Sequence, residues 1–85
     1  MYRPLVKVHL WSGLRALAGG QAAVELRAGT IGQMLDALVK EYPGLEAAVE
    51  AGVSVSVDGK IYAYGLTQEL TEDSEIYLLQ RIKGG

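Results

Sequence analysis

The chain has 85 residues, a net charge of −2 and a hydrophobic fraction of 49%, which allows one small domain with one core. It contains no cysteine, which excludes disulfides, thiolate metal sites and cysteine nucleophiles. Eight basic residues against ten acidic ones provide no excess of positive charge, so we expect no nucleic-acid partner. The first residues include no apolar run long enough for a signal peptide or a membrane helix, so we expect a cytoplasmic protein without a membrane partner.

Two stretches in the first third of the chain alternate in polarity, the pattern of half-buried strands. In residues 5–11, one face would hold Val6, Val8 and Leu10, and the other Lys7, His9 and Trp11. In residues 22–27, the inward face would hold Ala22, Val24 and Leu26. The simplest pairing is an antiparallel hairpin with a long connection over residues 12–20, pinned to the core by Leu14 and Leu17.

The middle of the chain carries the pattern of an amphipathic helix. Thr30 and Gln33 have the spacing of a capping box, which predicts a helix start at Thr30. An apolar stripe at helical spacing follows, made of Ile31, Met34, Leu35, Leu38, Val39 and Tyr42. Pro43-Gly44 predicts the end of this helix, and residues 45–51 predict a short second helical segment that ends at Gly52.

The last third predicts three more strands. Residues 53–57 alternate three inward valines with Ser54 and Ser56, which would point outward. Asp58-Gly59 is a strong hairpin signal that leads into a short strand over residues 60–64. Residues 65–72 would form a loop that buries Leu66 and Leu70, and a turn at residues 73–74 would lead into a final strand over residues 75–83.

This order of elements predicts an α+β domain in which a mixed sheet packs on one long helix. It is the β-grasp arrangement, the fold of ubiquitin. Residues 1–85 would form a single domain with a flexible C-terminal tail at Gly84-Gly85. If Gly85 ends the chain, its α-carboxylate is a reactive group with no side chain near it, and glycines can thread a narrow channel. The alternative is an ordinary frayed terminus.

Three stretches carry a resemblance to a known family. The first is Leu14-Arg15 followed by Gly19-Gly20-Gln21, the second is residues 29–33 leading into Leu35 and Leu38, and the third is Asp73-Ser74-Glu75-Ile76 running to Lys83-Gly84-Gly85. With the Val-x-Val-Asp-Gly segment at residues 55–59, the chain resembles the MoaD/ThiS family of ubiquitin-like sulfur carriers over essentially its whole length. Many molybdopterin-synthase small subunits carry Pro-Pro before Gly-Gly, whereas this chain has Gln80-Arg81-Ile82-Lys83.

The resemblance implies that the chain is a carrier, without catalytic groups, metal or bound cofactor of its own. An ATP-dependent activating enzyme, an adenylyltransferase, would convert the Gly85 carboxylate to an acyl-adenylate. A sulfur donor would then replace AMP and leave a thiocarboxylate. The sulfur would pass to an acceptor enzyme, with a molybdopterin synthase large subunit the first expectation and thiamine, cysteine or tRNA thiolation also open.

The resemblance also implies a docking surface. By the spacing of ubiquitin's tail, Ile76 and Leu78 would point into the core, which leaves Tyr77 and Leu79 on the open sheet face. His9, Trp11, Ser54 and Ser56 could share that face. Arg81 and Ile82, with Gly84, would contact the partner's groove. The alternative for Tyr77 and Leu79 is ordinary cross-strand packing.

Two other functions remain open at this point. The same activated Gly85 could be joined to lysines of target proteins, as in a ubiquitin-like modifier. The domain could instead be a non-carrier binding module with incidental glycines. An enzyme is not expected, because the sequence shows no nucleophile–base pair, and its single histidine, His9, has no cysteine or carboxylate cluster beside it.

Overall fold

The computed structural model describes residues 3–62 and 67–80. The strands in chain order are β1 (Leu5–Leu10), β2 (Ala23–Arg27), β3 (Val53–Val57), β4 (Lys60–Tyr62) and β5 (Ile76–Gln80). The helices are α1 (Ser12–Arg15), α2 (Ile31–Glu41) and α3 (Glu46–Ala51), with 3₁₀ turns η1 (Ala16–Ala18) and η2 (Pro43–Leu45).

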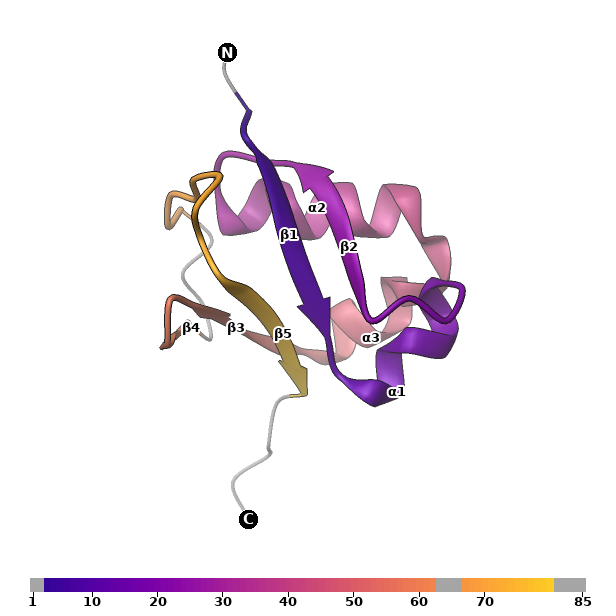
Figure 1. Cartoon of the computed structure of the whole chain (residues 1–85). Helices are drawn as coiled ribbons and strands as arrows, with labels where there is room; N and C mark the ends of the chain where they lie inside the picture. Colours follow the sequence, from indigo (N-terminus) through magenta and orange to yellow (C-terminus); the bar gives the residue numbers. More distant parts are fainter. Residues whose placement is uncertain (1–2, 63–66, 81–85) are drawn as a thin grey trace.

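The strands form one five-stranded sheet in the order β2-β1-β5-β3-β4. The β1–β5 pair is parallel, and the β1–β2, β3–β5 and β3–β4 pairs are antiparallel. Helices α2 and α3 lie behind the sheet, on one of its faces (Figure 1). The mixed sheet and the single helical layer confirm the predicted β-grasp fold.

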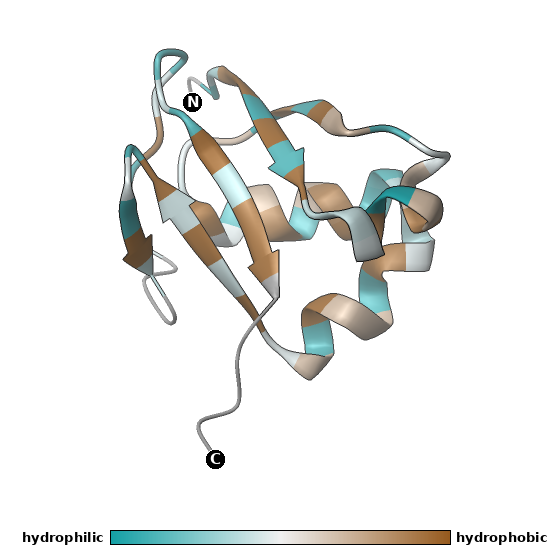
Figure 2. Cartoon of the chain, turned by 60° about the horizontal axis from the view of Figure 1, so that its bottom comes forward, coloured by the Kyte–Doolittle hydropathy of each residue, from teal (hydrophilic) through white to brown (hydrophobic). Residues whose placement is uncertain are grey.

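The core lies between the sheet and α2, where the alternation predicted it. Hydrophobic and more polar residues alternate along the strands (Figure 2). The inward strand residues are all buried, and they are Val6, Val8, Leu10, Val24, Leu26, Val53, Val55, Val57, Ile76 and Leu78. From α2, Ile31, Met34 and Leu38 meet them. Burial of each large apolar side chain contributes about 1.5–3 kcal/mol, so this layer is the main source of stability.

Side chains and a neighbouring loop satisfy the amides at the start of α2. The Thr30 hydroxyl accepts a hydrogen bond from the Gln33 amide at 3.2 Å. The Gln33 side chain accepts one from the Gly29 amide at 2.8 Å, one residue before the usual capping-box position. The Ile31 amide donates to the Gln68 carbonyl at 3.0 Å and the Leu70 amide to the Gly29 carbonyl at 2.9 Å, which ties the buried Leu70 to the helix start.

The connection between β1 and β2 differs from its prediction. Residues 12–18 form α1 and η1 instead of an irregular loop, and strand β1 ends one residue before Trp11. Leu14 is buried as expected, but Leu17 is 47% exposed, so its predicted core role is wrong. In these helical turns, Leu14 and Ala18, four residues apart, take the inward face, which leaves Leu17 outside the core. Ala22, predicted to face inward, lies before β2 and is exposed.

The helical layer follows its prediction closely. The predicted long helix is the eleven-residue α2, and the short second segment predicted over residues 45–51 is the six-residue α3, on the same side of the sheet. The short strand predicted over residues 60–64 is described as far as Tyr62, with residues 63 and 64 outside the described residues. The final strand begins at Ile76, one residue later than predicted. Leu66, predicted to be buried, and the last residues of the predicted final strand lie outside the described residues.

The β3–β4 turn is bound to the start of β5. Asp58 (φ 52°) and Gly59 (φ 86°) are left-handed, as a two-residue type I′ hairpin requires. The Asp58 amide donates to the Glu75 carbonyl at 2.9 Å. The Glu75 amide donates to the Asp58 carboxylate at 2.8 Å. This reciprocal pair sets where β5 begins relative to β3.

We expect Asp58→Ala to lower the free energy of unfolding by about 1–2 kcal/mol, because it removes the acceptor for the Glu75 amide and leaves alanine in left-handed backbone. Asp58→Asn is the matched control, since asparagine tolerates this backbone and keeps an acceptor oxygen; we expect it to stay within about 0.5 kcal/mol of the parent chain. Urea denaturation measures both. Equal losses for the two variants would contradict the role given to this side chain.

Candidate functional site

The base of the predicted reactive tail is strand β5, the middle strand of the sheet. It is paired on one side with β1, as far as Leu10↔Leu78, and on the other with β3, as far as Val53↔Gln80. Ile76 and Leu78 point into the core with no exposed surface, as predicted. The chain is therefore fixed by two neighbouring strands as far as Leu78, and by β3 alone up to Gln80, the last described residue of β5.

The remaining residues of the predicted tail site, Arg81, Ile82, Gly84 and Gly85, lie outside the described residues. Their roles stay predictions. Since β5 is parallel to β1, both strands end on the same side of the sheet, so the C-terminal end of β5 lies near the point where β1 leads into α1 (Figure 1).

The open face of the sheet carries Tyr77, as predicted. Tyr77 is opposite His9 on β1, and the two rings stack with centroids 4.6 Å apart and planes 19° apart. The cross-strand alternative is thus correct as far as contact goes, yet Tyr77 keeps 42% of its surface exposed. The Tyr77 side chain therefore packs against the neighbouring strand and still leaves surface that a partner could contact.

Leu79 and Trp11 differ in how they meet the expectation for this face. Leu79 is opposite Ser54 on β3 and is half-buried. Trp11 lies past the end of β1 and packs against the hydrophobic core. Its indole lies over Gly13, where a Cβ would be only 2.5 Å from the indole nitrogen. Trp11 is therefore half-buried filler beside α1 and does not join the row of Tyr77 and His9.

An exposed hydrophobic residue on this face was missed by the sequence reasoning. Ile61 on β4 is 63% exposed and lies opposite Ser56, which in turn lies opposite Tyr77. Ser56, predicted to point outward, is on that face but only 9% exposed, because larger neighbours flank it on both sides. A two-residue Asp58-Gly59 turn fixes the Ser56–Ile61 pair, so the hairpin signal could have located Ile61. We call His9, Ser56, Ile61, Tyr77 and Leu79 the sheet patch.

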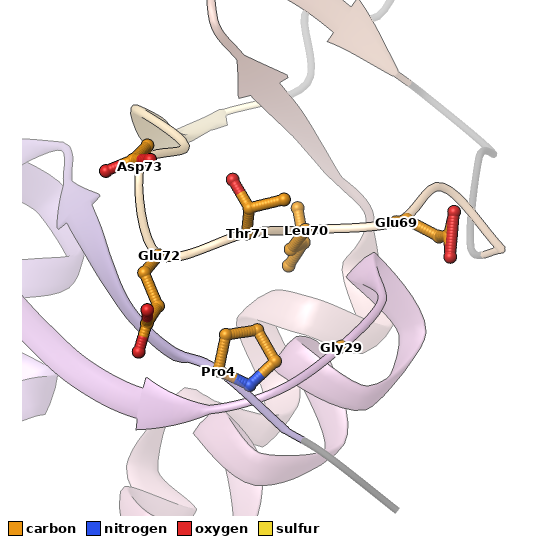
Figure 3. A pocket seen from close by; sticks show the side chains of 7 residues that line it. All are labelled: Pro4, Gly29, Glu69, Leu70, Thr71, Glu72 and Asp73. Carbon is orange, nitrogen blue, oxygen red and sulfur yellow. The ribbon is translucent and has the colours of Figure 1, made fainter.

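The other end of the molecule holds a pocket of about 320 Å³. Pro4, Gly29 and the segment from Glu69 to Asp73 line it (Figure 3). Pro4 precedes β1, whereas β5 ends beside the last residues of β1, so this pocket is remote from the base of the tail. Across residues 3–62 and 67–80, no group of three or more metal-binding side chains is close enough to hold an ion. Within the same residues, no helix is long and apolar enough to cross a membrane.

The structure resembles solved proteins over nearly its full length. Small archaeal modifier protein 1 (SAMP1) from Methanosarcina acetivorans matches with a TM-score of 0.82 and 24% identity, covering 100% of both chains. SAMP1 from Haloferax volcanii matches at 0.77 and 26% identity, covering 95% of this chain and 99% of that one. The Amycolatopsis orientalis BexX/CysO complex matches at 0.76 and 23% identity, covering 94% and 99%. No curated protein matches by sequence.

The comparison with family models decides the family. The model of the ThiS family matches residues 8–85, a range that begins in β1, includes all the later strands and extends through both final glycines. This agrees with the MoaD/ThiS resemblance predicted from the sequence. The chain belongs to the ThiS family.

Proposed function

We propose that this chain is a sulfur carrier whose Gly85 carboxylate is adenylated and converted to a thiocarboxylate. The observation that carries the proposal is the match to the ThiS family, which includes Gly84-Gly85. In the sequence, these glycines follow the central strand β5. The carrier acts as a co-substrate in this proposal, and the catalytic groups belong to its partners.

The chemistry explains why an activating enzyme is needed. A carboxylate is a poor electrophile, so an oxygen of Gly85 would attack the α-phosphorus of ATP and release pyrophosphate. The resulting acyl-adenylate has AMP as a good leaving group. A persulfide donor would attack the acyl carbon with its outer sulfur, AMP would leave, and a thiol would then reduce the acyl disulfide to the thiocarboxylate. The partner thus uses ATP, and the carrier binds no cofactor.

The arrangement of β5 suits this role. Ordering one flexible residue on binding costs about 1–2 kcal/mol, and strand pairing fixes the chain as far as Gln80, so the partner has no residue of β5 to order. Glycines at the tip allow close approach of the partner's backbone and nucleotide. Arg81 and Ile82 would lie between the fixed strand and the glycines, where we propose that they contact the partner's channel.

We propose that the sheet patch is the docking surface for the activating enzyme and then for the acceptor. Tyr77 and Leu79 are on the same strand as the tail, so a partner that covers them is positioned to receive Gly85. CysO was solved in a complex with BexX, which supports a mode of action through partner proteins for a chain of this fold. The acceptor would be an enzyme such as a molybdopterin synthase large subunit, with thiamine, cysteine and tRNA thiolation as other destinations.

A second candidate is a protein modifier. Its support is the 26% identity to a protein described as a small archaeal modifier. Both functions begin with the same adenylate and differ in the nucleophile that attacks it, which is a sulfur in the carrier and a lysine amine in the modifier. One activated tail can serve both.

Incubation with ATP, the activating enzyme from the same genome and a persulfide donor should raise the intact mass by the difference between one sulfur and one oxygen atom. Electrospray mass spectrometry measures this gain, and fragmentation should place it on Gly85. The matched control carries one alanine after Gly85, which converts the glycine carboxylate into a peptide bond. Its mass should not increase. An unchanged mass for the parent chain would contradict the carrier function, and isopeptide adducts without any sulfur gain would favour the modifier.

Tyr77→Ser should raise the KM of the activating enzyme for the carrier at least about tenfold, because aromatic side chains in the centre of an interface commonly contribute more than 1 kcal/mol. Leu17→Ser is the matched control, since Leu17 is 47% and Tyr77 42% exposed, yet Leu17 is on η1 outside the sheet patch. Steady-state pyrophosphate release at varied carrier concentration measures both. Equal effects of the two variants would contradict docking through this face.

A further inference from the structure

The helical side of the molecule carries an apolar groove that the proposed function does not use. It lies between α2 and α3 and has a volume of about 260 Å³. Three half-buried hydrophobic side chains line it: Leu35 and Val39 from α2, and Val49 from α3. Leu35 and Val49 also pack against the core, so they form a fixed floor for the groove.

All the charged residues that line this groove are acidic. Asp36 on α2 and Glu46 and Glu50 on α3 flank its apolar floor. Among the described residues, these three carboxylates have no hydrogen bond or ion pair. Lys40 is the basic residue in the last turn of α2, and it does not line the groove. A cationic ligand would therefore find three unpaired carboxylates around an apolar floor.

We infer that the α2–α3 groove is a second docking site, and that it binds a basic amphipathic segment of a partner protein. The segment would insert apolar side chains between the helices and place Lys or Arg beside Asp36, Glu46 and Glu50. An amphipathic helix in an apolar groove is a recurrent mode of peptide recognition, and complementary charge sets its register and on-rate.

The charge pattern argues against other occupants. In a symmetric dimer through this groove, each acidic rim would meet its own copy, and like charges would repel. Nucleic acids and anionic membranes are disfavoured for the same reason. The groove also lies on the helical side, away from the sheet patch (Figure 1). A protein bound there would leave Tyr77 and the end of β5 accessible, so two partners could bind at once.

A titration of the isotope-labelled chain with a synthetic helical peptide tests this inference. The peptide carries two leucines one helical turn apart, with lysines on both sides. Amide shifts should saturate and should concentrate in α2 and α3. A peptide with glutamates in place of the lysines, and one with serines in place of the leucines, should each lose saturable binding.

Three double variants separate binding in the groove from general attraction to an acidic protein. Glu46→Lys with Glu50→Lys should weaken peptide binding about tenfold, which corresponds to about 1.4 kcal/mol. Glu72→Lys with Asp73→Lys changes the net charge equally but alters the remote pocket, and should change binding less than about twofold. Glu46→Gln with Glu50→Gln removes the two charges without reversing them, so it should weaken peptide binding by an intermediate amount. The amide spectrum of this variant shows whether the chain is still folded.

Equal weakening by the two lysine variants, shifts centred on the sheet patch, or no saturable binding would each overturn the inference. Binding of the serine peptide as tightly as the leucine peptide would also overturn it, because the apolar floor would then contribute nothing. None of these outcomes depends on whether Gly85 is activated.

Discussion

The structure depends on the pairing of β5 between β1 and β3. The last strand of the chain takes the middle of the sheet, so its pairing joins the β1–β2 hairpin to the β3–β4 hairpin. Ile76 and Leu78 are fully buried from this strand and contribute about 1.5–3 kcal/mol each to stability. Without β5, β1 would pair only with β2 and β3 only with β4, and each hairpin would have an exposed strand edge where β5 now lies.

The same strand divides the two tasks that the proposed carrier performs. Its inward residues hold the domain together, and its outward residues, Tyr77 and Leu79, form part of the sheet patch. The chain then continues directly toward Gly85. In the proposed carrier, alternate side chains of one strand would thus serve stability and docking, and the same strand would lead to the reactive end. The α2–α3 groove is lined by residues of the two helices and includes none from this strand.

Period-two alternation was the most dependable signal in the sequence. It placed every buried hydrophobic strand residue from Val6 to Leu78, and its one wrong inward assignment was Ala22, which is exposed. Asp58-Gly59 predicted the β3–β4 turn with its left-handed backbone. The capping pair Thr30 and Gln33 located the start of α2 to the residue. These features are local, since each depends on neighbours within a few residues.

The features that were missed depend on contacts between segments far apart in the chain. Leu17 is exposed because the helical turns of residues 12–18 pack Leu14 and Ala18 against the core instead, whereas the glycines at positions 13, 19 and 20 had favoured a loop. Ile61 was overlooked because its importance arises from its row with Ser56 and Tyr77, across three strands. The α2–α3 groove needs the packing of two helices, and the apolar stripe of α2 alone does not show which of its residues stay partly open. The binding partners cannot be read from local pattern at all.

In the proposed function, the activating enzyme recognises the folded sheet and reacts with the glycine tail, and efficient adenylation needs both. ATP–pyrophosphate exchange by the activating enzyme tests it directly, with the whole chain compared against a synthetic peptide of residues 81–85. The whole chain should support exchange with an efficiency, kcat/KM, at least about a hundredfold above that of the peptide, which is about 2.7 kcal/mol of docking through the fold. Exchange of equal efficiency with the peptide would contradict the account, because the sheet patch would then contribute nothing to recognition.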